Sequence, residues 1–458
     1  MSLAALILTE FTAELALFAA AGFLLFAIDD LAVDLIYFVR SAWRALAVYS
    51  RFPRMSAAAL PAPMRPGWMA VLIPAWDEAP VIAPMLRSTL ARFIHEEYWL
   101  FVGHYRNDPA TRAAIDSVED ARIVPVEIDA DGPTTKADCL NRLYASLVAY
   151  EGVVGRNAKA IVLHDAEDLV HPLELKLFDR LVEYAALVQL PVVPLIDQRS
   201  RWVAGHYADE FAETHMKELV VREAVGAAIP LAGVGCAIER VALSRLAARR
   251  DGRPFAGTSM TEDYELGLRL GAIGLKTMFV RIPAEQGGRA VVASRGHFPS
   301  TISAAVRQKA RWIGGIAFAG WDRLGWRGGI GERWMRMRDR RGPLAALLLV
   351  AGYGAAILWA EVELATALGA PVAVPISAPL AMLMWTNGWL LAWRMMMRAS
   401  FTTSAYGWRE GLRSIPRMVV ANIVAVLAAW RALLLHSAGG AQQWDKTQHI
   451  FPVEIPRA

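Results

Sequence analysis

The chain has 458 residues, of which 55% are hydrophobic, and its mean hydropathy is +0.31. This composition excludes an ordinary soluble protein and indicates a membrane protein. The net charge is only +4 with both signs interspersed, and no run of basic residues interleaves with aromatic ones as a nucleic-acid groove requires, so no nucleic-acid partner is expected.

The N-terminal segment predicts one membrane span followed by a helix on the membrane surface. The uncharged run at 15–28 reaches spanning length when it is extended upstream. No Lys or Arg precedes Arg40, so the basic start of a signal peptide is missing and we expect an uncleaved anchor. The following run DDLAVDLIYFVRSAWRAL predicts an amphipathic surface helix with solvated carboxylates at Asp29, Asp30 and Asp34.

The C-terminal part predicts a hairpin of two further spans. Apolar runs occupy about 343–370 and 374–393. The later stretch 418–430 is shorter and contains Asn422, which favours a surface helix over a span. Arginines gather after the first span and before the second, which places the N-terminus outside and the middle of the chain in the cytoplasm by the positive-inside rule.

The middle of the chain alternates short apolar runs with helical patterns. The runs WMAVLIP, WLFVGHY, ARIVPVEI and AIVLHD are each followed by an expected helix, at Pro80 to Phe93, Pro109 to Val118, Thr134 to Tyr150 and Pro172 to Leu187. Continuously apolar strands are buried on both faces, so this is an α/β domain with a mostly parallel sheet. We expect membrane parts at 1–66 and 343–458 around a domain at 67–342.

Ligands of such sheets bind beyond the carboxyl ends of the strands, where acidic residues occur here. Asp165 and Glu167 follow AIVLHD and fall on one side of an extended chain, which suits Mg²⁺ or Mn²⁺ on a diphosphate. Capping of the next helix by Glu167 or Asp168 is the alternative. Asp77 and Asp108 are candidates for base or ribose contacts, with helix capping again the alternative.

Three further groups could carry chemistry. Lys136 opens an expected helix and could bind a phosphate, although a surface lysine is the simpler interpretation. Asp263 is a candidate general base with Glu262 beside it, although acidic residues also favour a first helical turn. One helical face is formed by Gln308, Arg311 and Trp312. This face could contact a diphosphate and a sugar, or it could anchor the helix at the membrane interface.

The order of these motifs along the chain identifies a protein family more specifically than any single motif does. PAWDE, RNDP, TTKAD, DAED, TED and QKARW follow one another, the last just before apolar helices. Over roughly 68–312 the chain resembles the processive family 2 glycosyltransferases, the group of cellulose, chitin and hyaluronan synthases. The resemblance implies a GT-A fold, a divalent metal (Mg²⁺ or Mn²⁺), and inverting transfer from a nucleotide-diphosphate sugar. A UDP-sugar, with an N-acetylhexosamine favoured, is the implied donor.

The resemblance also implies roles. The nucleotide sugar would contact Asp77, Asp108, Lys136 and Asp165; the metal would be held by Asp165 and Glu167; catalysis would use Asp263 and Glu262; the acceptor and diphosphate would be clamped by Gln308, Arg311 and Trp312. Glu167 stands where the family motif has Asp, and PAWDE stands where many members have PAYNE. Those two departures leave the metal geometry and the role of Asp77 open.

A longer set of segments, including DDLAVDLIYFVR, RNDPAT, HDAEDLVHP, VRQKARWIGGIAFAGW and WDKTQH, resembles the inner-membrane phage-adsorption protein B type of this family. That implies a multi-pass protein of the bacterial inner membrane, a cytoplasmic catalytic domain, a glycan or lipid-linked acceptor, membrane lipids as partners, and export partners in the outer membrane or periplasm. Longer members carry a cyclic-di-GMP-responsive domain, so such control is expected to need a separate protein here.

Two other functions remain open from the residues. A transferase could add a single sugar to a polyprenyl phosphate, or a membrane scaffold or receptor component could retain a transferase fold without activity. The tail motif WDKTQH at 444–449 is expected on the cytoplasmic side, either packed there or as part of a gate over the nucleotide site.

Overall fold

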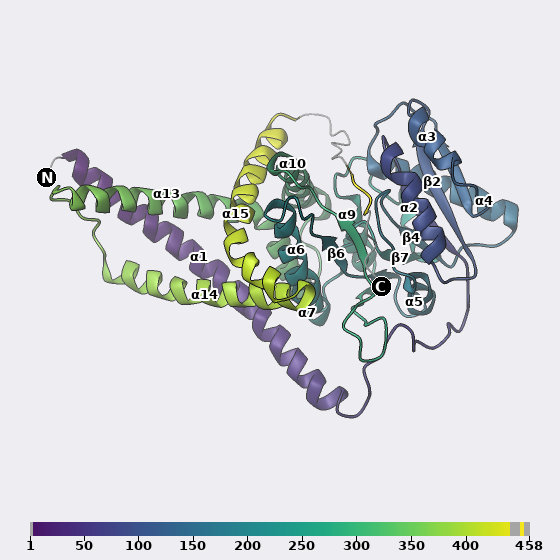
Figure 1. Ribbon diagram of the computed structural model, residues 1–458, viewed down its shortest axis with the longest axis horizontal. Helices are drawn as coiled ribbons and strands as arrows, with labels where there is room; N and C mark the ends of the chain where they lie inside the picture. The colour runs from purple at the N-terminus through teal and green to yellow at the C-terminus, as the bar shows by residue number, and fades with distance from the viewer. Residues whose placement is uncertain (1–2, 440–448, 453–458) are drawn as a thin grey trace.

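The computed structural model describes residues 3–439 and 449–452, and its centre is an α/β domain (Figure 1). A seven-stranded sheet runs in the order β3-β2-β1-β4-β7-β5-β8. Its strands are β1 Met69–Pro74, β2 Tyr98–Tyr105, β3 Ile123–Ile128, β4 Ala160–Leu163, β5 Leu187–Gln189, β7 Cys236–Glu239 and β8 Thr277–Phe279. Within the described part of the chain only β7 pairs antiparallel, with β4 and β5, so the expected mostly parallel sheet is confirmed.

Helices cover both faces of this sheet. One apolar layer packs under α4 Lys136–Val154, α8 Arg240–Ala247 and α9 Glu262–Ala272, and the other under α2 Ala79–Arg92, α3 Pro109–Asp116 and α5 Glu174–Leu181. Successive residues of β1 point into opposite layers, because side chains alternate along a strand: Leu72 enters the first layer and Val71 the second, and both are fully buried. This explains why the strand is continuously apolar.

One expected helix is shorter than its pattern suggests. We expected a helix over Pro172 to Leu187, but α5 ends at Leu181 and Leu187 begins β5. Residues 187–189 pair with β7 on one side and β8 on the other. Pairing with distant strands overrides local periodicity here.

A smaller parallel sheet, β6 Val192–Leu195 with β9 Ser294–His297, extends the domain toward the C-terminal helices. The surrounding helices are α6 Val203–Glu213, the π-helical turn η2 Thr214–Glu218, α7 Leu219–Ala224, α10 Ile302–Ile313, the π-helical turn η3 Gly314–Ala319, α11 Gly320–Leu324 and α12 Ile330–Arg340. α6 packs against β6 on one side and against the C-terminal helices on the other.

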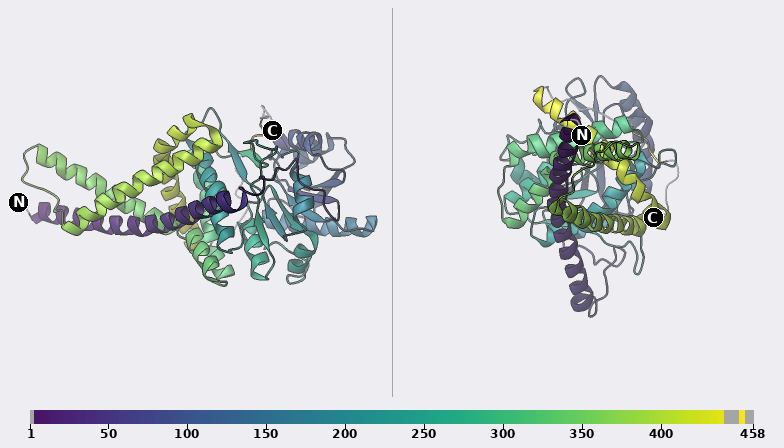
Figure 2. Two further views of the ribbon diagram at one scale, coloured as in Figure 1. Left: turned by 90° about the horizontal axis from the view of Figure 1, so that it is seen from below. Right: turned by 90° about the vertical axis from the view of Figure 1, so that its left-hand side faces the viewer.

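Three long helices project together from one side of this domain (Figures 1 and 2). They are α1 Leu3–Trp43, which continues into the π-helical turn η1 Arg44–Val48, α13 Gly342–Ala367 and α14 Ala378–Tyr406. Both α13 and α14 pack against α1. The expected division of the N-terminal segment into a span and a separate surface helix is wrong, because α1 runs unbroken through both.

The acidic residues in the middle of α1 are not solvated as we expected. Asp29 and Asp30 each lie 2.6 Å from the guanidinium of Arg341, and Asp34 lies 2.6 Å from Nζ of Lys217. Asp34 is only 4% exposed. These ion pairs join α1 to the start of α13 and to η2, so the carboxylates fasten the N-terminal helix to the sheet domain.

The last helix, α15 Trp408–Ser437, differs most from the expected short surface segment at 418–430. Among the described residues, three helices are long and apolar enough to cross a membrane: the α1 region at 5–48, α13 and α15. α14 does not meet that criterion, because Thr386 and Asn387 interrupt its apolar run at 378–393 and Arg394 follows it directly, which lowers the mean hydropathy of the helix.

The packing of α15 is nevertheless that of a helix lying against the domain. It crosses the projecting bundle where the bundle meets the sheet domain (Figure 1), and it contacts α6, α10, α13 and α14. Its buried side is rich in small residues, at Gly411, Ser414, Ala421, Ala428, Ala429 and Ala432. Its exposed side is apolar, at Trp408, Leu412, Val419, Ile423, Leu427, Trp430 and Leu434.

Candidate active site

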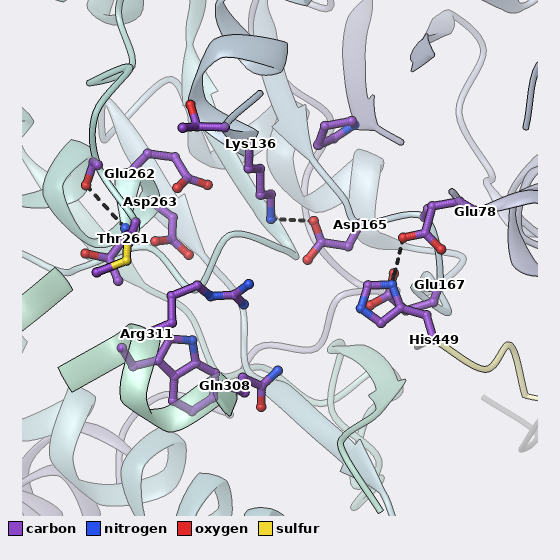
Figure 3. A pocket seen from close by; sticks show the side chains of 16 residues that line it. Glu78, Lys136, Asp165, Glu167, Thr261, Glu262, Asp263, Gln308, Arg311 and His449 are labelled. Carbon is purple, nitrogen blue, oxygen red and sulfur yellow. Dashed lines mark hydrogen bonds and ion pairs between the residues drawn. The ribbon is translucent and has the colours of Figure 1, made fainter. Parts of the chain in front are cut away.

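A cleft opens at the carboxyl ends of β1 and β4, where the parallel-sheet rule places ligands (Figure 3). Five separate segments of the sheet domain and the C-terminal segment at 449 supply its walls. Its lining includes Pro74, Glu78, Thr135, Lys136, Asp165, Ala166, Glu167, Ser259, Met260, Thr261, Glu262, Asp263, Gln308, Arg311, Trp312 and His449. The sequence motifs TTKAD, DAED, TED and QKARW therefore meet in one place.

Lys136 places a positive charge at the centre of this cleft. Thr135 caps α4 by accepting a hydrogen bond from the amide of Asp138 at 3.1 Å, which fixes the first turn of the helix. The ammonium of Lys136 forms an ion pair with Asp165. Burial alone would lower the pKa of Lys136, but the charges of Asp165, Glu262 and Asp263 outweigh it and raise the pKa, so the side chain is a cation at neutral pH.

The DAED turn after β4 is held from beneath by a buried histidine that we did not anticipate. His164 contacts Asp168 through Nδ1 at 2.9 Å and Glu174 through Nε2 at 2.6 Å. Burial lowers the pKa of His164, but Glu174 and Asp168 together raise it to about 10. Asp168 in turn accepts the amide of Asp165 at 3.0 Å, so Asp168 closes the turn and aims Asp165 into the cleft.

Glu262 and Asp263 begin α9 and both line the cleft. Burial, reinforced by the neighbouring charge of Asp263, raises the pKa of Glu262 to about 7. Burial also raises the pKa of Asp263, against the opposing attraction of Lys136. The carboxylate of Asp263 accepts the amide of Tyr264 at 2.7 Å, which holds its orientation. A carboxyl group with a raised pKa is suited to accept a proton near neutral pH.

The predicted shared face of α10 is present, and it faces the cleft. Gln308, Arg311 and Trp312 all line it, and the guanidinium of Arg311 points toward the space between Asp165 and Asp263 (Figure 3). The Trp312 ring packs edge-on against the Tyr207 ring with centroids 6.1 Å apart, which anchors the helix to α6. This arrangement puts the arginine in the cleft and packs the tryptophan against α6.

Asp77 and Asp108 do not line the cleft. Asp108 caps α3 by accepting the amide of Thr111 at 3.2 Å, and its other oxygen accepts the amide of Asp77 at 2.6 Å. The backbone of Asp77 has a left-handed φ of 54°, and Glu78 rather than Asp77 is the residue after β1 that reaches the cleft. Their contact with a nucleotide stays a prediction.

Asp165 and Glu167 both line the cleft but have different partners. Asp165 pairs with Lys136, whereas Glu167 lies 3.1 Å from Nδ1 of His449. The same imidazole nitrogen lies 2.8 Å from Glu78. Burial lowers the pKa of His449, but the two glutamates raise it to about 10. The other residues of WDKTQH lie outside the described part of the chain, so only His449 of that motif can be placed.

Comparison with known proteins identifies the family of this chain. The model of the family described as "Glycosyltransferase like family 2" matches residues 66–315. The chain belongs to this glycosyltransferase family. The match ends just beyond the QKARW helix, so it covers the segments of the sheet domain that form the cleft, while the long projecting helices lie mostly outside it.

Two curated relatives and one solved structure extend the comparison. Bacteriophage adsorption protein B of Escherichia coli K12 is 35% identical over 456 residues, covering 93% of this chain and 60% of the relative, and the counterpart from Escherichia coli O157:H7 gives the same values. The chain thus spans about 60% of the length of these relatives. A mannosyltransferase from Pyrobaculum calidifontis, solved with GDP-Man and Mn²⁺, is 18% identical with a TM-score of 0.49, covering 88% of this chain and 99% of its own.

Proposed function

We propose that this chain is an inverting glycosyltransferase that moves a sugar from a nucleotide diphosphate, a UDP-sugar by family resemblance, to a growing polysaccharide at the bacterial inner membrane. The observation that carries the proposal is the meeting of Lys136, Asp165, Asp263 and Arg311 in one cleft. These residues come from four segments far apart in the sequence, and together they offer a base, a metal-binding carboxylate and two cations.

In this mechanism Asp263 accepts the proton of the acceptor hydroxyl as that oxygen attacks the anomeric carbon. Lys136 and Arg311 counter the charge that develops on the departing nucleotide diphosphate, and both point into the same space (Figure 3). Attack from the side of Asp263, opposite to the leaving diphosphate, inverts the anomeric centre. Trp312 and Gln308 hold the acceptor sugar beside the base.

The cleft also has ligands for a divalent cation. Glu167 Oε2 is buried beside Nδ1 of His449, and the carboxylates that line the cleft are hard oxygen donors of the kind such ions prefer. A bound Mg²⁺ or Mn²⁺ would neutralise the diphosphate of the leaving nucleotide. Asp165 and Glu167 would hold it, with Asp165 released from Lys136.

Acceptor growth beside the membrane is supported by the packing of α10. The helix that carries Arg311 and Trp312 lies directly against α15, with Ala310 packed on Ala428 and Ala432. The opposite side of α15 is apolar and exposed, as expected for a helix at a lipid surface. We propose that 67–342 is the cytoplasmic catalytic domain, that α1, α13 and α14 form the membrane bundle, and that α15 lies between them.

The decisive experiment is a donor panel followed by one substitution. Purified protein is incubated with Mn²⁺ and a series of UDP-sugars and GDP-sugars, and nucleotide release and products are measured. Asp263→Asn should abolish transfer and leave nucleotide binding close to that of the unmodified protein. Asp129→Asn is the matched control, because that side chain is 96% exposed and lies outside the cleft.

The same experiment separates the alternatives. Polymer supports the proposal, a lipid-linked monosaccharide indicates a single-addition polyprenyl-phosphate enzyme, and no nucleotide release from any donor indicates a scaffold. Retained transfer in Asp263→Asn would remove the assignment of the base.

A further inference from the structure

A second hollow opens in the sheet domain, away from the active cleft. Its volume is about 700 Å³, and none of its described lining residues also lines the cleft. Its walls come from the end of α7 at 223–228, from 271–277 between α9 and β8, from 327–336 at the start of α12, and from Arg249 after α8. A hollow of this size is large enough to hold a small-molecule ligand.

Positive charge dominates the wall of the second hollow. Its charged lining side chains are four cations and two carboxylates: Arg249, Lys276, Arg327, Arg336, Glu223 and Glu332. Glu332 is already engaged, because its two oxygens accept Nε of Arg336 at 2.7 Å and the amide of Ala228 at 2.8 Å. Glu223 lies 3.9 Å from Arg40, and burial raises its pKa. The two carboxylates therefore do not balance the other three cations.

Those three cations come from segments far apart in the sequence. Arg249, Lys276 and Arg327 are all exposed, and none of them forms an ion pair with a residue in 3–439 or 449–452. Lys276 attracts the charge of Glu223 without a close contact between the two side chains. Like charges gathered around one hollow repel one another, and a bound anion would relieve that repulsion.

The backbone adds hydrogen-bond donors to the same wall. Gly328 and Gly329 line the hollow just before α12, and Gly329 caps that helix without any side-chain hydrogen bond. The first amides of a helix have no acceptor within the helix, and the helix dipole places partial positive charge there. Glycines before a helix start let an anion approach these amides closely, which is an arrangement that binds phosphate groups in many proteins.

We propose that the second hollow is a binding site for a phosphate-bearing ligand, which Arg249, Lys276 and Arg327 hold together with the start of α12. Two guanidinium groups can each donate paired hydrogen bonds to phosphate oxygens, and the ammonium adds a compact positive charge. The inference goes beyond the proposed function and does not depend on it, because no residue of the active cleft takes part.

Two sources can supply such a phosphate group, a lipid headgroup and a soluble phosphate ester. The hollow borders α1, because Glu223 on its wall pairs with Arg40 of that helix. Around Arg40, α1 exposes large apolar side chains at Leu35, Phe38, Val39 and Trp43. Exposed apolar residues next to arginines are typical of a helix at a lipid surface, so this neighbourhood favours the headgroup.

Binding can be measured on the full-length protein in an uncharged detergent, without divalent metal, by isothermal titration calorimetry. The probes are a short-chain phosphatidic acid, the matching diacylglycerol that lacks the phosphate, and inorganic pyrophosphate. Phosphatidic acid should bind at least about tenfold more tightly than the diacylglycerol, because only the phosphate can pair with the cations. Binding of phosphatidic acid alone identifies a lipid headgroup as the source, whereas binding of pyrophosphate identifies a soluble phosphate ester.

Substitutions at the wall assign the binding to the hollow. Arg249→Gln and Arg327→Gln should each weaken binding of the phosphate probe by about tenfold, because each removes a charge-assisted hydrogen bond. The matched controls Arg245→Gln and Arg333→Gln remove exposed arginines from the same two parts of the chain but outside the hollow, and they should bind as the unmodified protein does. Thermal unfolding without ligand should agree among all four variants within a few degrees, which shows that they are folded.

Several results would overturn the proposal. They are a lack of binding by both phosphate probes, affinities within about twofold of the unmodified value in both Arg249→Gln and Arg327→Gln, equal losses in the control variants, and equal binding of the diacylglycerol. Loss of binding in Lys136→Gln alone would place the anion in the active cleft and would also overturn it. Failure of the proposed function gives a different result, because a protein that binds phosphate through Arg249 and Arg327 but uses no sugar donor would reject the transferase and keep this site.

Discussion

Replacing Gly233 by alanine tests whether the position of Asp263 is critical. Gly233 has a left-handed φ of +78°, and a Cβ added there would lie 2.6 Å from Oδ2 of Asp263 and 3.4 Å from Nζ of Lys136. Alanine in this conformation costs about 1–2 kcal/mol at any site. Here the carboxylate must also retreat by about 0.8 Å to restore ordinary contact, and a displacement near 1 Å can cost about 100-fold in rate.

The matched control is Gly274→Ala. Gly274 has a nearly identical φ of +80°, but none of the described residues places an atom within 4 Å of an added Cβ there. Both variants should lose similar thermal stability from backbone strain. Only Gly233→Ala should lose about 100-fold in kcat with the donor that the panel identifies, while its affinity for the nucleotide changes little, because Asp263 acts on the acceptor.

Two results would refute the expectation that the position of Asp263 is critical. If Gly233→Ala transfers sugar within about threefold of Gly274→Ala, then either Asp263 is not the base or its position in the cleft does not matter. Equal loss in both variants would show that backbone strain alone explains the effect. Either result would contradict the reasoning from the close approach of Gly233.

Other expectations follow from the same cleft and its supports. His164→Asn should lower the free energy of unfolding by about 3–5 kcal/mol, because two carboxylates lose their buried cation. The folded pKa of His164 is raised to about 10, so this contribution is complete below about pH 6.5 and is lost as the pH rises toward 10. Thermal unfolding of the variant and of the unmodified protein should therefore differ more at pH 7 than at pH 10. A difference that does not vary with pH would contradict a charged imidazole. Ala428→Leu should overpack the contact of α15 with α10, costing about 1–3 kcal/mol in thermal unfolding and lowering kcat, whereas Ala425→Leu, at a partly exposed position of the same helix, should do neither. Arg311→Lys should lower kcat by about tenfold with the fold intact, because an ammonium lacks the planar fork of a guanidinium, and Arg307→Lys on the same helix serves as the control for that assay.

Local patterns were sufficient for much of the fold and half of the cleft. The continuously apolar runs predicted the parallel strands, because both faces of this sheet are covered by helices. The spacing of Gln308, Arg311 and Trp312 predicted a common helical face, and Lys136, Asp165, Glu167 and Asp263 were placed at the starts of helices or the ends of strands where they occur. Such features depend on 3.6-residue and 2-residue periodicities, which are visible in sequence alone.

Other features of the protein depend on tertiary contacts, which the periodicities of the sequence do not reveal. Asp77 has a positive φ, and Glu78 beside it lines the cleft. The ion pairs of Asp29, Asp30 and Asp34 hold α1 against the domain. Leu187 belongs to a strand because it pairs with a strand that lies far along the chain. His449 lies 371 residues after Glu78, so no local pattern could indicate that the two side chains meet. Contacts of that kind arise only when the whole chain is packed, because their stabilising energy comes from partners remote in sequence.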